Sequence, residues 1–519
     1  MAHSTEPNND DRRPITKWLD RGIVACLFVI AAFAPVSIAV TQAAWLLGTT
    51  LWVIRLAVFP RPRLSRSPID YALLGFFILS GISGVFSYNP TMSLGKMRAA
   101  SLFIIVYLIA QNIKSSRIVR LLAFTLIASC VITTLLTLGQ FVVGKGVKVY
   151  GVKPASVLSQ AVFHTRTVKQ PTPIIDGDTI WEVDGQRINN PDELATALAG
   201  APNAPTATVK IYRVEWTPSL EVPRGNLITG NTALEQLGIT AWTRGRDWRA
   251  TGFYGHWVTY AEVLQLIASF ALGLFLSLPT KRSLTGIFLL LSLVLMLLSL
   301  GLTITRASWI GFAVSATLLL ALSVSRRTLV AAGIVAVLLV LAGVFVLQQK
   351  RGIGLFDRSD QSTSWRETVW REGFELLVSK PRHLLVGVGI DSIKGHWREW
   401  GLFDNGRLPI GHMHSNLLQI ALERGVPALI AWLILLGLYT RMLWKVIRAA
   451  VGNGGQWIAR GISLGALGGL VGFFTSGIVH YNWGDSEVVT VFYFIMGLSV
   501  VVQRVYSVPS AVAETSDKL

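Results

Sequence analysis

The chain has 519 residues, of which 52% are hydrophobic and only 15% are charged, and its mean hydropathy is +0.52. This composition excludes an ordinary soluble globular protein. The formal net charge of +18 would suit a nucleic-acid-binding protein, but the cations gather in short clusters between apolar runs, which indicates a membrane protein instead.

Long apolar runs predict the fold class. A helix that crosses a bilayer needs roughly 17–25 mostly apolar residues, and about twelve runs approach this length. We therefore expect an all-α polytopic membrane protein with about twelve transmembrane helices. The fourth run is short and the second contains Arg55. The predicted spans lie near residues 21–41, 43–60, 68–86, 99–112, 118–143, 257–279, 284–304, 307–325, 328–347, 426–444, 457–479 and 486–504.

Basic clusters predict the orientation of these spans. They precede the first span and follow the second, fourth, sixth, eighth and tenth, all on one side of a twelve-span arrangement. The positive-inside rule then places both termini in the cytoplasm, and the long connections 144–256 and 348–425 outside, which in a bacterium is the periplasm. The first run has no signal-peptide cleavage site, so we expect it to remain as an anchor of an inner-membrane protein. Cys26 and Cys130 lie within spans, so no disulfide or zinc site is expected.

The chain thus divides into seven predicted segments. Two are cytoplasmic tails, three are groups of spans and two are outer connections. In chain order they are the tail 1–20, spans one to five in 21–143, the connection 144–256, spans six to nine in 257–347, the connection 348–425, spans ten to twelve in 426–504, and the tail 505–519.

The first outer connection contains a small α+β module between about 145 and 250. Asp176-Gly177 and Asp184-Gly185 supply tight turns in a strand, turn, strand, helix, strand order. This order resembles the second half of a PDZ domain. The glycine-rich carboxylate-binding loop of that family does not precede it, so we interpret the insertion as a packing or docking module, with peptide capture as the alternative.

The second outer connection predicts an interfacial helix. The sequence from Ser364 to Glu367 is a capping-box pattern, so we expect the helix to start there. Arg366, Trp370, Phe374 and Leu377 then share one face, and Lys380-Pro381 ends the helix.

Four outer features gather polar groups that a purely structural membrane protein would avoid. Each also has a structural interpretation: a membrane anchor for Arg306, a surface ion pair for Arg366, lipid-headgroup binding for the basic aromatic segment 242–257, and a satisfied helix end for His414. The principal candidates are Arg306, Arg366, Arg246, Arg249 and His414; weaker substrate-binding candidates are His412, Asn416, Gln419, Trp365, Tyr254 and His256.

Together these features point to an anionic, phosphate-bearing ligand. Arginine suits bidentate recognition of phosphate, and a helix that begins near His414 adds backbone N–H donors and its positive dipole end. The outer acids Asp357, Asp360, Asp391, Asp404, Asp485 and Glu487 are scattered in the sequence. We therefore expect no metal site and no cofactor.

Four ordered motifs resemble one family. TGFYGHWVTYAEVL, TRASWIG, SWRETVWREGFELLVSKPRHLLVGVG and HSNLLQIALERGVPALI, within residues 250–430, resemble the O-antigen ligase and polymerase superfamily of bacterial inner membranes. The resemblance implies a C-type glycosyltransferase fold fed by undecaprenyl-diphosphate-linked glycan. Arg306 and Arg366 match the family's essential outer arginines and His414 its essential histidine. The PDZ-like insertion departs from the simplest members.

Residues and resemblance together suggest an inverting transfer. Arg306 and Arg366 would stabilise the departing diphosphate. His414, neutral near an ordinary pKa of about 6.5, would take the proton of the acceptor hydroxyl. A histidine that only positions the acceptor gives the same sequence pattern, and His412 and the more remote His256 are rival bases.

Four functions fit this pattern. A ligase would transfer glycan to the sugar core of lipid A, a polymerase would extend it on the carrier, and a protein O-oligosaccharyltransferase would use serine or threonine. A non-enzymic glycan transporter predicts cationic residues deep inside several spans, whereas here, apart from Arg55, the charges gather at the outer ends of the spans. We favour the ligase. Its expected partners are the lipid-linked donor, the lipid A–core acceptor, membrane lipids and a possible protein bound by the insertion, with no nucleic acid.

Overall fold

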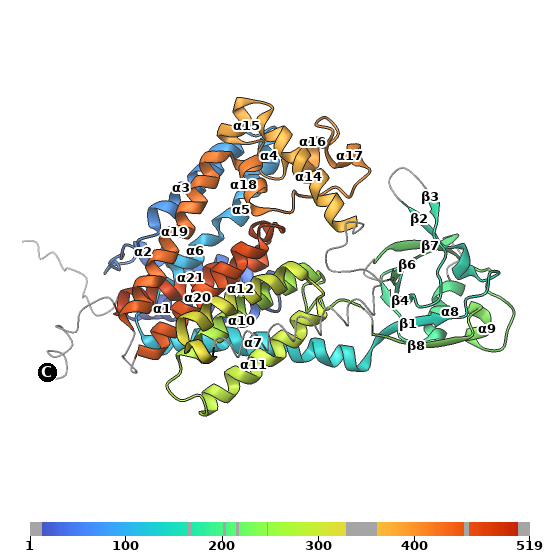
Figure 1. The fold of residues 1–519 in the computed structure, drawn as a ribbon, viewed down its shortest axis with the longest axis horizontal. Coiled ribbons are helices and arrows are strands. Elements are labelled where there is room, and N and C mark those ends of the chain that lie inside the picture. Colours follow the sequence, from blue (N-terminus) through green and yellow to red (C-terminus); the bar gives the residue numbers. More distant parts are fainter. Residues whose placement is uncertain are drawn as a thin grey trace, which may run out of the picture. The chain divides into compact units, whose positions relative to one another are not determined.

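The computed structural model describes residues 13–164, 169–200, 204–213, 217–246, 248–328, 361–450 and 456–506. It divides into two compact units: Met1–Thr134 with Thr251–Leu519, which we call the helical unit, and Leu135–Ala250, which we call the sheet unit. Figure 1 labels the elements of both.

The helical unit contains long helices joined by short capped turns. Ser37, for example, precedes a helix and accepts a hydrogen bond from the backbone N–H of Val40, which satisfies one donor of the first turn. The elements before the insertion are α1 Arg13–Phe33, α2 Ile38–Ala57, α3 Asp70–Val85, α4 Pro90–Gly95, α5 Met97–Ala100, η1 Ser101–Phe103, α6 Ile104–Asn112 and α7 Ser116–Val143.

The second part of the helical unit alternates long spans with short outer helices. Gly425, at φ +84°, separates one short helix from the span that follows it. The elements are α10 Trp257–Ser277, α11 Leu284–Leu302, α12 Arg306–Ser323, α14 Gln361–Val378, α15 Pro381–Val386, α16 Ser392–His396, α17 Leu402–Gly406, α18 Asn416–Arg424, α19 Val426–Ala449, α20 Trp457–Ser476, η4 Asn482–Gly484 and α21 Ser486–Tyr506.

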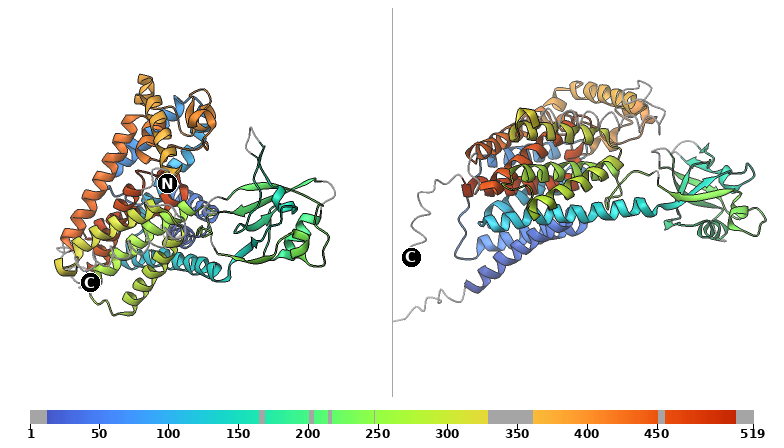
Figure 2. Two further views of the ribbon diagram at one scale, coloured as in Figure 1. Left: turned by 45° about the vertical axis from the view of Figure 1, so that its right-hand side comes forward. Right: turned by 60° about the horizontal axis from the view of Figure 1, so that its bottom comes forward.

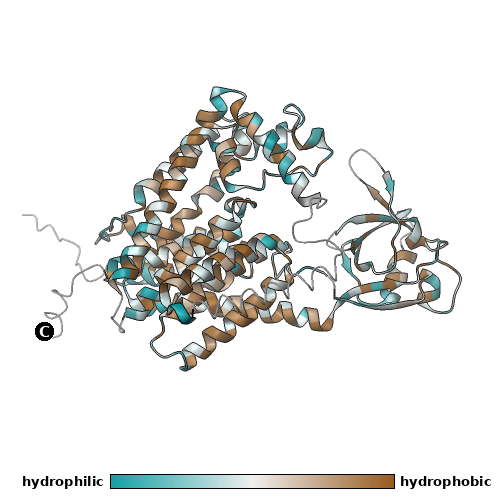
Figure 3. Ribbon diagram, in the orientation of Figure 1, coloured by the Kyte–Doolittle hydropathy of each residue, from teal (hydrophilic) through white to brown (hydrophobic). Residues whose placement is uncertain are grey.

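The helices confirm a polytopic membrane protein. Within the described residues, nine helical segments are long and apolar enough to cross a membrane. The shorter apolar helix α3 coincides with the predicted span 68–86, whereas α1 overlaps the first predicted span, 21–41, but starts at Arg13 and ends at Phe33. The remaining predicted span, 328–347, lies outside the described residues. Figure 3 shows hydrophobic residues concentrated along the long helices, α11 among them, where Leu284 and Leu291 are exposed as expected of a lipid-facing surface.

Helices α10 and α20 pack against each other in the centre of the helical unit, and the views in Figures 1 and 2 agree on this pairing. Glycines permit the close approach. A Cβ placed on Gly273 of α10 would lie 2.1 Å from the backbone nitrogen of Gly465 on α20. Gly461 and Gly465 repeat at the four-residue spacing that brings small residues to one helix face. The glycine-rich sequence of α20 therefore sets the distance between two helices that carry polar groups.

The sheet unit is one antiparallel sheet with short helices. Its strand order is β3-β2-β7-β6-β4-β1-β8, with β5 paired to β4, and register pairs such as Val147 with Ile180 and Val209 with Leu220 place aliphatic side chains in its core. Figure 2 shows the twist of its strands. The elements are β1 Lys145–Tyr150, η2 Val157–Gln160, β2 Val162–His164, β3 Lys169–Pro171, β4 Thr179–Val183, β5 Gln186–Arg187, α8 Pro191–Ala199, β6 Thr206–Tyr212, β7 Ser219–Pro223, α9 Ala233–Leu237 and β8 Ala241–Gly245.

The predicted strand, turn, strand, helix, strand order is present in this unit. Asp184 and Gly185 adopt positive φ values of +49° and +83° between β4 and β5, and the side chain of Asn190 caps α8. A small α+β insertion is therefore confirmed, whereas the small sheet supports the likeness to a PDZ domain only loosely.

Candidate active site

His414 lies in a short loop immediately before α18. Ser415 is the N-cap residue of that helix and its side chain accepts from the backbone N–H of Leu418, so the predicted helix start beside His414 is confirmed. His414 itself adopts a left-handed backbone with φ +47°. Its N–H donates to Nδ1 of His412 at 3.2 Å, and the two imidazole rings are 4.0 Å apart. Histidine at positive φ is uncommon, and such positions cluster at functional sites.

Helices α14 and α18 hold this loop from two sides. Nε1 of Trp370 on α14 donates to the carbonyl oxygen of Met413 at 2.8 Å. The N–H of Met413 donates to Oε1 of Gln419 on α18 at 2.6 Å. Trp365 of α14 packs its ring edge-on against His414, with ring centroids 4.4 Å apart. The positions of both imidazoles are therefore set by packing and hydrogen bonds rather than by a free loop.

Both histidines are neutral at physiological pH. Burial, followed by the neighbouring His412, lowers the pKa of His414 to about 2, and the positive charge of Arg366 contributes in the same direction. Burial lowers the pKa of His412 to about 4. The pKa of His414 lies well below the ordinary value of about 6.5 that we expected, and it favours the neutral imidazole. A negative charge bound nearby would raise the pKa again and make the imidazole a stronger base.

Arg366 and Arg306 occupy different helices. Arg366 lies on α14, one residue after the tryptophan that contacts His414. Arg306 is the first residue of α12, directly after the N-cap Thr305. The capping-box prediction is wrong in detail, because α14 already includes Gln361 and the carbonyl of Ser364 accepts an intrahelical bond from Thr368 at 3.2 Å. Ser364 is thus inside the helix, and the predicted end before Pro381 is confirmed.

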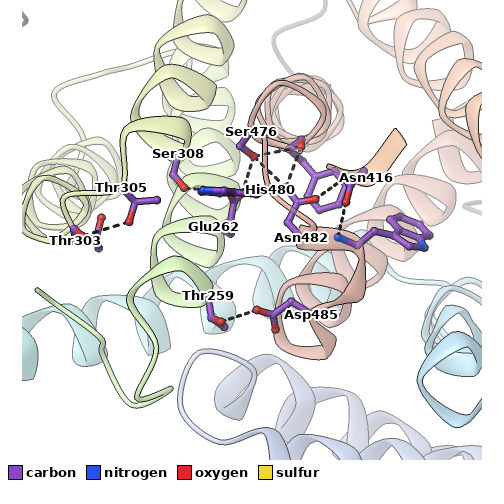
Figure 4. A network of polar contacts seen from close by, with 12 residues as sticks. Thr259, Glu262, Thr303, Thr305, Ser308, Asn416, Ser476, His480, Asn482 and Asp485 are labelled. Carbon is purple, nitrogen blue, oxygen red and sulfur yellow. Dashed lines mark hydrogen bonds and ion pairs between the residues drawn. The ribbon is translucent and has the colours of Figure 1, made fainter. Parts of the chain in front are cut away.

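A buried polar network, shown in Figure 4, was not predicted. Glu262 of α10 is 0% exposed. Its carboxylate contacts Nδ1 of His480 at 3.0 Å and accepts hydrogen bonds from Ser308 at 3.1 Å, Ser476 at 2.7 Å and Asn482 at 3.2 Å. This acidic residue lies inside the predicted span 257–279 and was not among the candidate site residues. An acidic residue inside the apolar run 257–279 was the available signal.

Asn416 connects this network to the histidine loop. Its Nδ2 donates to Oδ1 of Asn482 at 2.6 Å, and its Oδ1 accepts from the N–H of Trp483 at 3.0 Å. The side chain is 1% exposed, so its amide is buried and hydrogen-bonded to other parts of the protein. This burial argues against the predicted substrate contact for Asn416 and indicates a positioning role two residues after His414.

A cavity of about 370 Å³ lies beside the histidines. His412, Gln419 and Tyr481 contribute to its wall, and the rings of His412 and Tyr481 are 5.6 Å apart. Four acidic and three basic residues line it: Asp391, Glu423, Asp485, Glu487, Lys96, Lys394 and Arg424. Three of the acids that look scattered in the sequence, Asp391, Asp485 and Glu487, are thus together in space. Among the described residues, no group of three His, Cys, Asp or Glu side chains is arranged to hold a metal ion.

The remaining predicted residues divide between the two units. Arg246 and Arg249 belong to the sheet unit, so their contact with a diphosphate stays a prediction. Tyr254 donates through its hydroxyl to the carbonyl of Ala34 at 2.7 Å, which gives it a structural role. His256 is the N-cap residue of α10, is exposed and is one of the groups whose charge lowers the pKa of His414.

Comparison with known proteins finds a family match in one segment of the chain. Residues 291–433 match the family model described as O-antigen ligase, a segment that runs from within α11 into α19 and contains Arg306, Arg366, His412 and His414. No curated protein matches the chain. The matched segment carries the histidine loop and both arginines on a polytopic membrane scaffold, and the match supports a glycosyltransferase-like enzyme similar to the O-antigen ligase superfamily.

Proposed function

We propose that the protein is an O-antigen ligase that transfers glycan from undecaprenyl diphosphate to the sugar core of lipid A, with inversion at the anomeric carbon. The observation that carries this proposal is the position of the His414 imidazole, whose ring lies 4.0 Å from that of His412 and 4.4 Å from that of Trp365, the residue next to Arg366. A proton acceptor and a fixed positive charge are the two groups that glycosyl transfer from a diphosphate requires.

Arg306 and Arg366 would bind the diphosphate. Guanidinium groups form bidentate hydrogen bonds with phosphate and keep their charge at any physiological pH. As the bond between the anomeric carbon and the diphosphate oxygen breaks, negative charge accumulates on that oxygen, and the arginines stabilise it. One well-placed donor of this kind contributes about 3–4 kcal/mol to the transition state. In the proposed step, the charges of the two arginines stabilise the leaving diphosphate.

His414 would act as the general base. The acceptor hydroxyl oxygen bonds to the anomeric carbon, its proton passes to the imidazole, and undecaprenyl diphosphate leaves with the electron pair of the broken bond. Burial lowers the pKa of His414 and so makes it a weak base. The bound diphosphate supplies the negative charge that raises this pKa, so the base becomes effective when the donor is in place.

The proposed setting is the bacterial inner membrane, with the site facing the periplasm. Support comes from the basic clusters in 61–66, 114–120 and 441–448, which the positive-inside rule assigns to the cytoplasm together with both termini. The sheet unit would then lie in the periplasm as a packing or docking module for a protein partner.

Reconstitution tests the proposal. The purified protein is placed in vesicles with undecaprenyl-diphosphate-linked glycan, with and without lipid A–core, and the products are separated on a gel. Glycan on the core supports the ligase. Longer glycan on the carrier alone would replace it with the polymerase, and no new product in either sample would favour the transporter.

A further inference from the structure

The cavity beside the histidine loop has no assigned role in the proposed glycan transfer. Its volume of about 370 Å³ lies within the range of small-molecule sites, which is roughly 300–1,000 Å³. His412 lines it, and its ring centroid lies 4.0 Å from that of His414, with the two rings tilted by 40°. A molecule in this cavity would therefore contact His412 and lie within one ring of His414, close to the position that the acceptor hydroxyl has to reach.

The charges of the cavity wall distinguish between the two substrates. Four carboxyl groups and three cations line it. Two of those cations are already paired: Lys96 and Lys394 each contact Asp391, at 2.9 Å and 2.8 Å. A diphosphate would approach carboxylates that repel it. A neutral sugar ring, whose hydroxyls both donate and accept, can use the carboxylates and the cations alike.

Arg424 provides a second, independent observation. Its side chain is 7% exposed and lines the cavity. One NH₂ group donates to the hydroxyl of Tyr481 at 3.3 Å, and the guanidinium lies 3.8 Å from the Glu423 carboxylate. Its Nε–H has no hydrogen-bond partner among the described residues. A buried donor of this kind is costly unless something accepts from it, and a hydroxyl oxygen in the cavity would do so.

We infer that this cavity is the acceptor subsite and binds a sugar ring of the acceptor glycan, with its attacking hydroxyl at the His412 end. This inference rests on the proposed function and deepens it. Asp391 and Glu423 accept from ring hydroxyls, Arg424 and Lys394 donate to them, and Tyr481 and Trp483 supply apolar surface for the C–H faces of the ring. The diphosphate of the donor stays outside the cavity, at the arginines.

Two aspartates make a matched pair for the test. Asp391 and Asp404 both adopt left-handed backbones, with φ values of +64° and +50°. Each forms an ion pair with a cation three residues later, Lys394 and Arg407 respectively. Only Asp391 lines the cavity. Asparagine tolerates this backbone conformation as well as aspartate does, so neither Asp391→Asn nor Asp404→Asn strains the backbone, although Asp391→Asn also weakens a second ion pair, with Lys96.

The experiment measures initial transfer rates while each substrate is varied in turn. We expect Asp391→Asn to raise the KM for lipid A–core about tenfold, because a hydrogen bond to a charged group is weakened, and to leave the KM for the lipid-linked donor unchanged. Asp404→Asn should leave both unchanged. An increased donor KM, or an unchanged acceptor KM, in Asp391→Asn would overturn the inference. If Asp391→Asn fails to fold, the exposed pair Lys394→Gln and Arg407→Gln makes the same comparison.

A binding measurement separates this inference from the proposed function. Delipidated core oligosaccharide is added to the donor-free protein in detergent, and ligand-observed saturation-transfer NMR detects its contact with the protein. Wild type and Asp404→Asn should show saturation transfer, and Asp391→Asn should lose most of it. No transfer with the wild type would overturn the acceptor subsite. A chain that binds the oligosaccharide yet adds no glycan to lipid A–core would instead contradict the ligase alone.

Discussion

The imidazole of His480 lies 3.0 Å from a carboxylate oxygen of Glu262, although the two residues are 218 positions apart. The same carboxylate accepts from Ser308, two residues after Arg306 on α12. Through Asn482 it also reaches Asn416, two residues after His414. One buried carboxylate thus connects the helix that begins with the arginine to the helix that begins after the histidine (Figure 4). Glu262 is a positioning residue for the proposed site.

Replacement of Glu262 should therefore destabilise the protein. In Glu262→Ala, the buried partners lose their common acceptor, which we expect to cost about 3–5 kcal/mol of unfolding free energy. Glu262→Gln retains acceptor oxygen and should recover most of the stability. Thermal unfolding in detergent measures both, with the exposed Glu375→Ala as the control. Equal melting temperatures for Glu262→Ala and wild type would contradict this role.

Loss of the His414 imidazole should abolish transfer. Asparagine is suited to the left-handed backbone of this position, so His414→Asn should fold and insert normally, while kcat falls about 10²–10⁴-fold because the general base is missing. His412→Gln should have a smaller effect on kcat. Transfer assays on reconstituted vesicles provide the measurement. Normal transfer by His414→Asn would falsify the base assignment.

The two arginines should determine donor affinity and turnover. Arg366→Gln and Arg306→Gln should raise the donor KM and reduce kcat by roughly 10²–10³, since each removes a cation from the departing diphosphate. Arg371, exposed on α14, provides the matched control Arg371→Gln. Rates at varied donor concentration distinguish these variants. If Arg366→Gln and Arg371→Gln behaved alike, the charge of Arg366 would have no special role.

Removal of the Arg366 charge has a further consequence for His414. That charge lowers the pKa of the imidazole, so in Arg366→Gln the pKa should rise. NMR of ¹³C-labelled histidine over a pH series reports the change. An unchanged His414 titration would mean that the two residues are not electrostatically coupled.

The lowered histidine pKa values predict acid sensitivity. His412 and His414 have folded-state pKa values of about 4 and about 2, below the unfolded value of about 6.5. Between those limits the unfolded chain binds more protons than the folded protein, so stability rises with pH up to about 6.5 and is flat above it as far as these groups are concerned. Acidification from about pH 7.5 to about pH 5 should lower the melting temperature, and less so in a His412→Gln/His414→Asn double variant. Equal losses in both proteins would contradict the assignment.

The glycine contact between α10 and α20 predicts a contrast between two substitutions. A Cβ at Gly465 would lie 2.5 Å from the carbonyl oxygen of Phe270, so Gly465→Ala should force the helices apart and destabilise by about 1–3 kcal/mol. Gly437 on α19 has nothing within 4 Å of such a Cβ. Gly437→Ala should be neutral or stabilise by up to about 1 kcal/mol. Comparison of the two melting temperatures checks this prediction.

The sequence by itself determined the features that depend on local chemistry. A bilayer requires apolar length whatever the packing, so runs such as 118–143 and 486–504 could be recognised as spans and correspond to α7 and α21. Ser415 marks the start of α18 because an N-cap acts on the next few residues. His414 could be chosen as a candidate because an ionisable residue next to an apolar span is visible in the sequence. The predicted start of α14 at Ser364 was wrong, because the helix already begins at Gln361, before the capping-box pattern.

Only the tertiary structure decided which polar groups meet. Glu262 and His480 contact each other because α10 and α20 approach closely through glycines, and the glycine spacing in α20 does not tell which helix packs against it. The acids that line the cavity come from segments up to about a hundred residues apart for the same reason. The pKa of His414 departs from its ordinary value because burial and neighbouring charges exist only in the folded protein. The sequence gives the type of each residue, whereas its contacts, burial and electrostatic environment depend on how the helices pack.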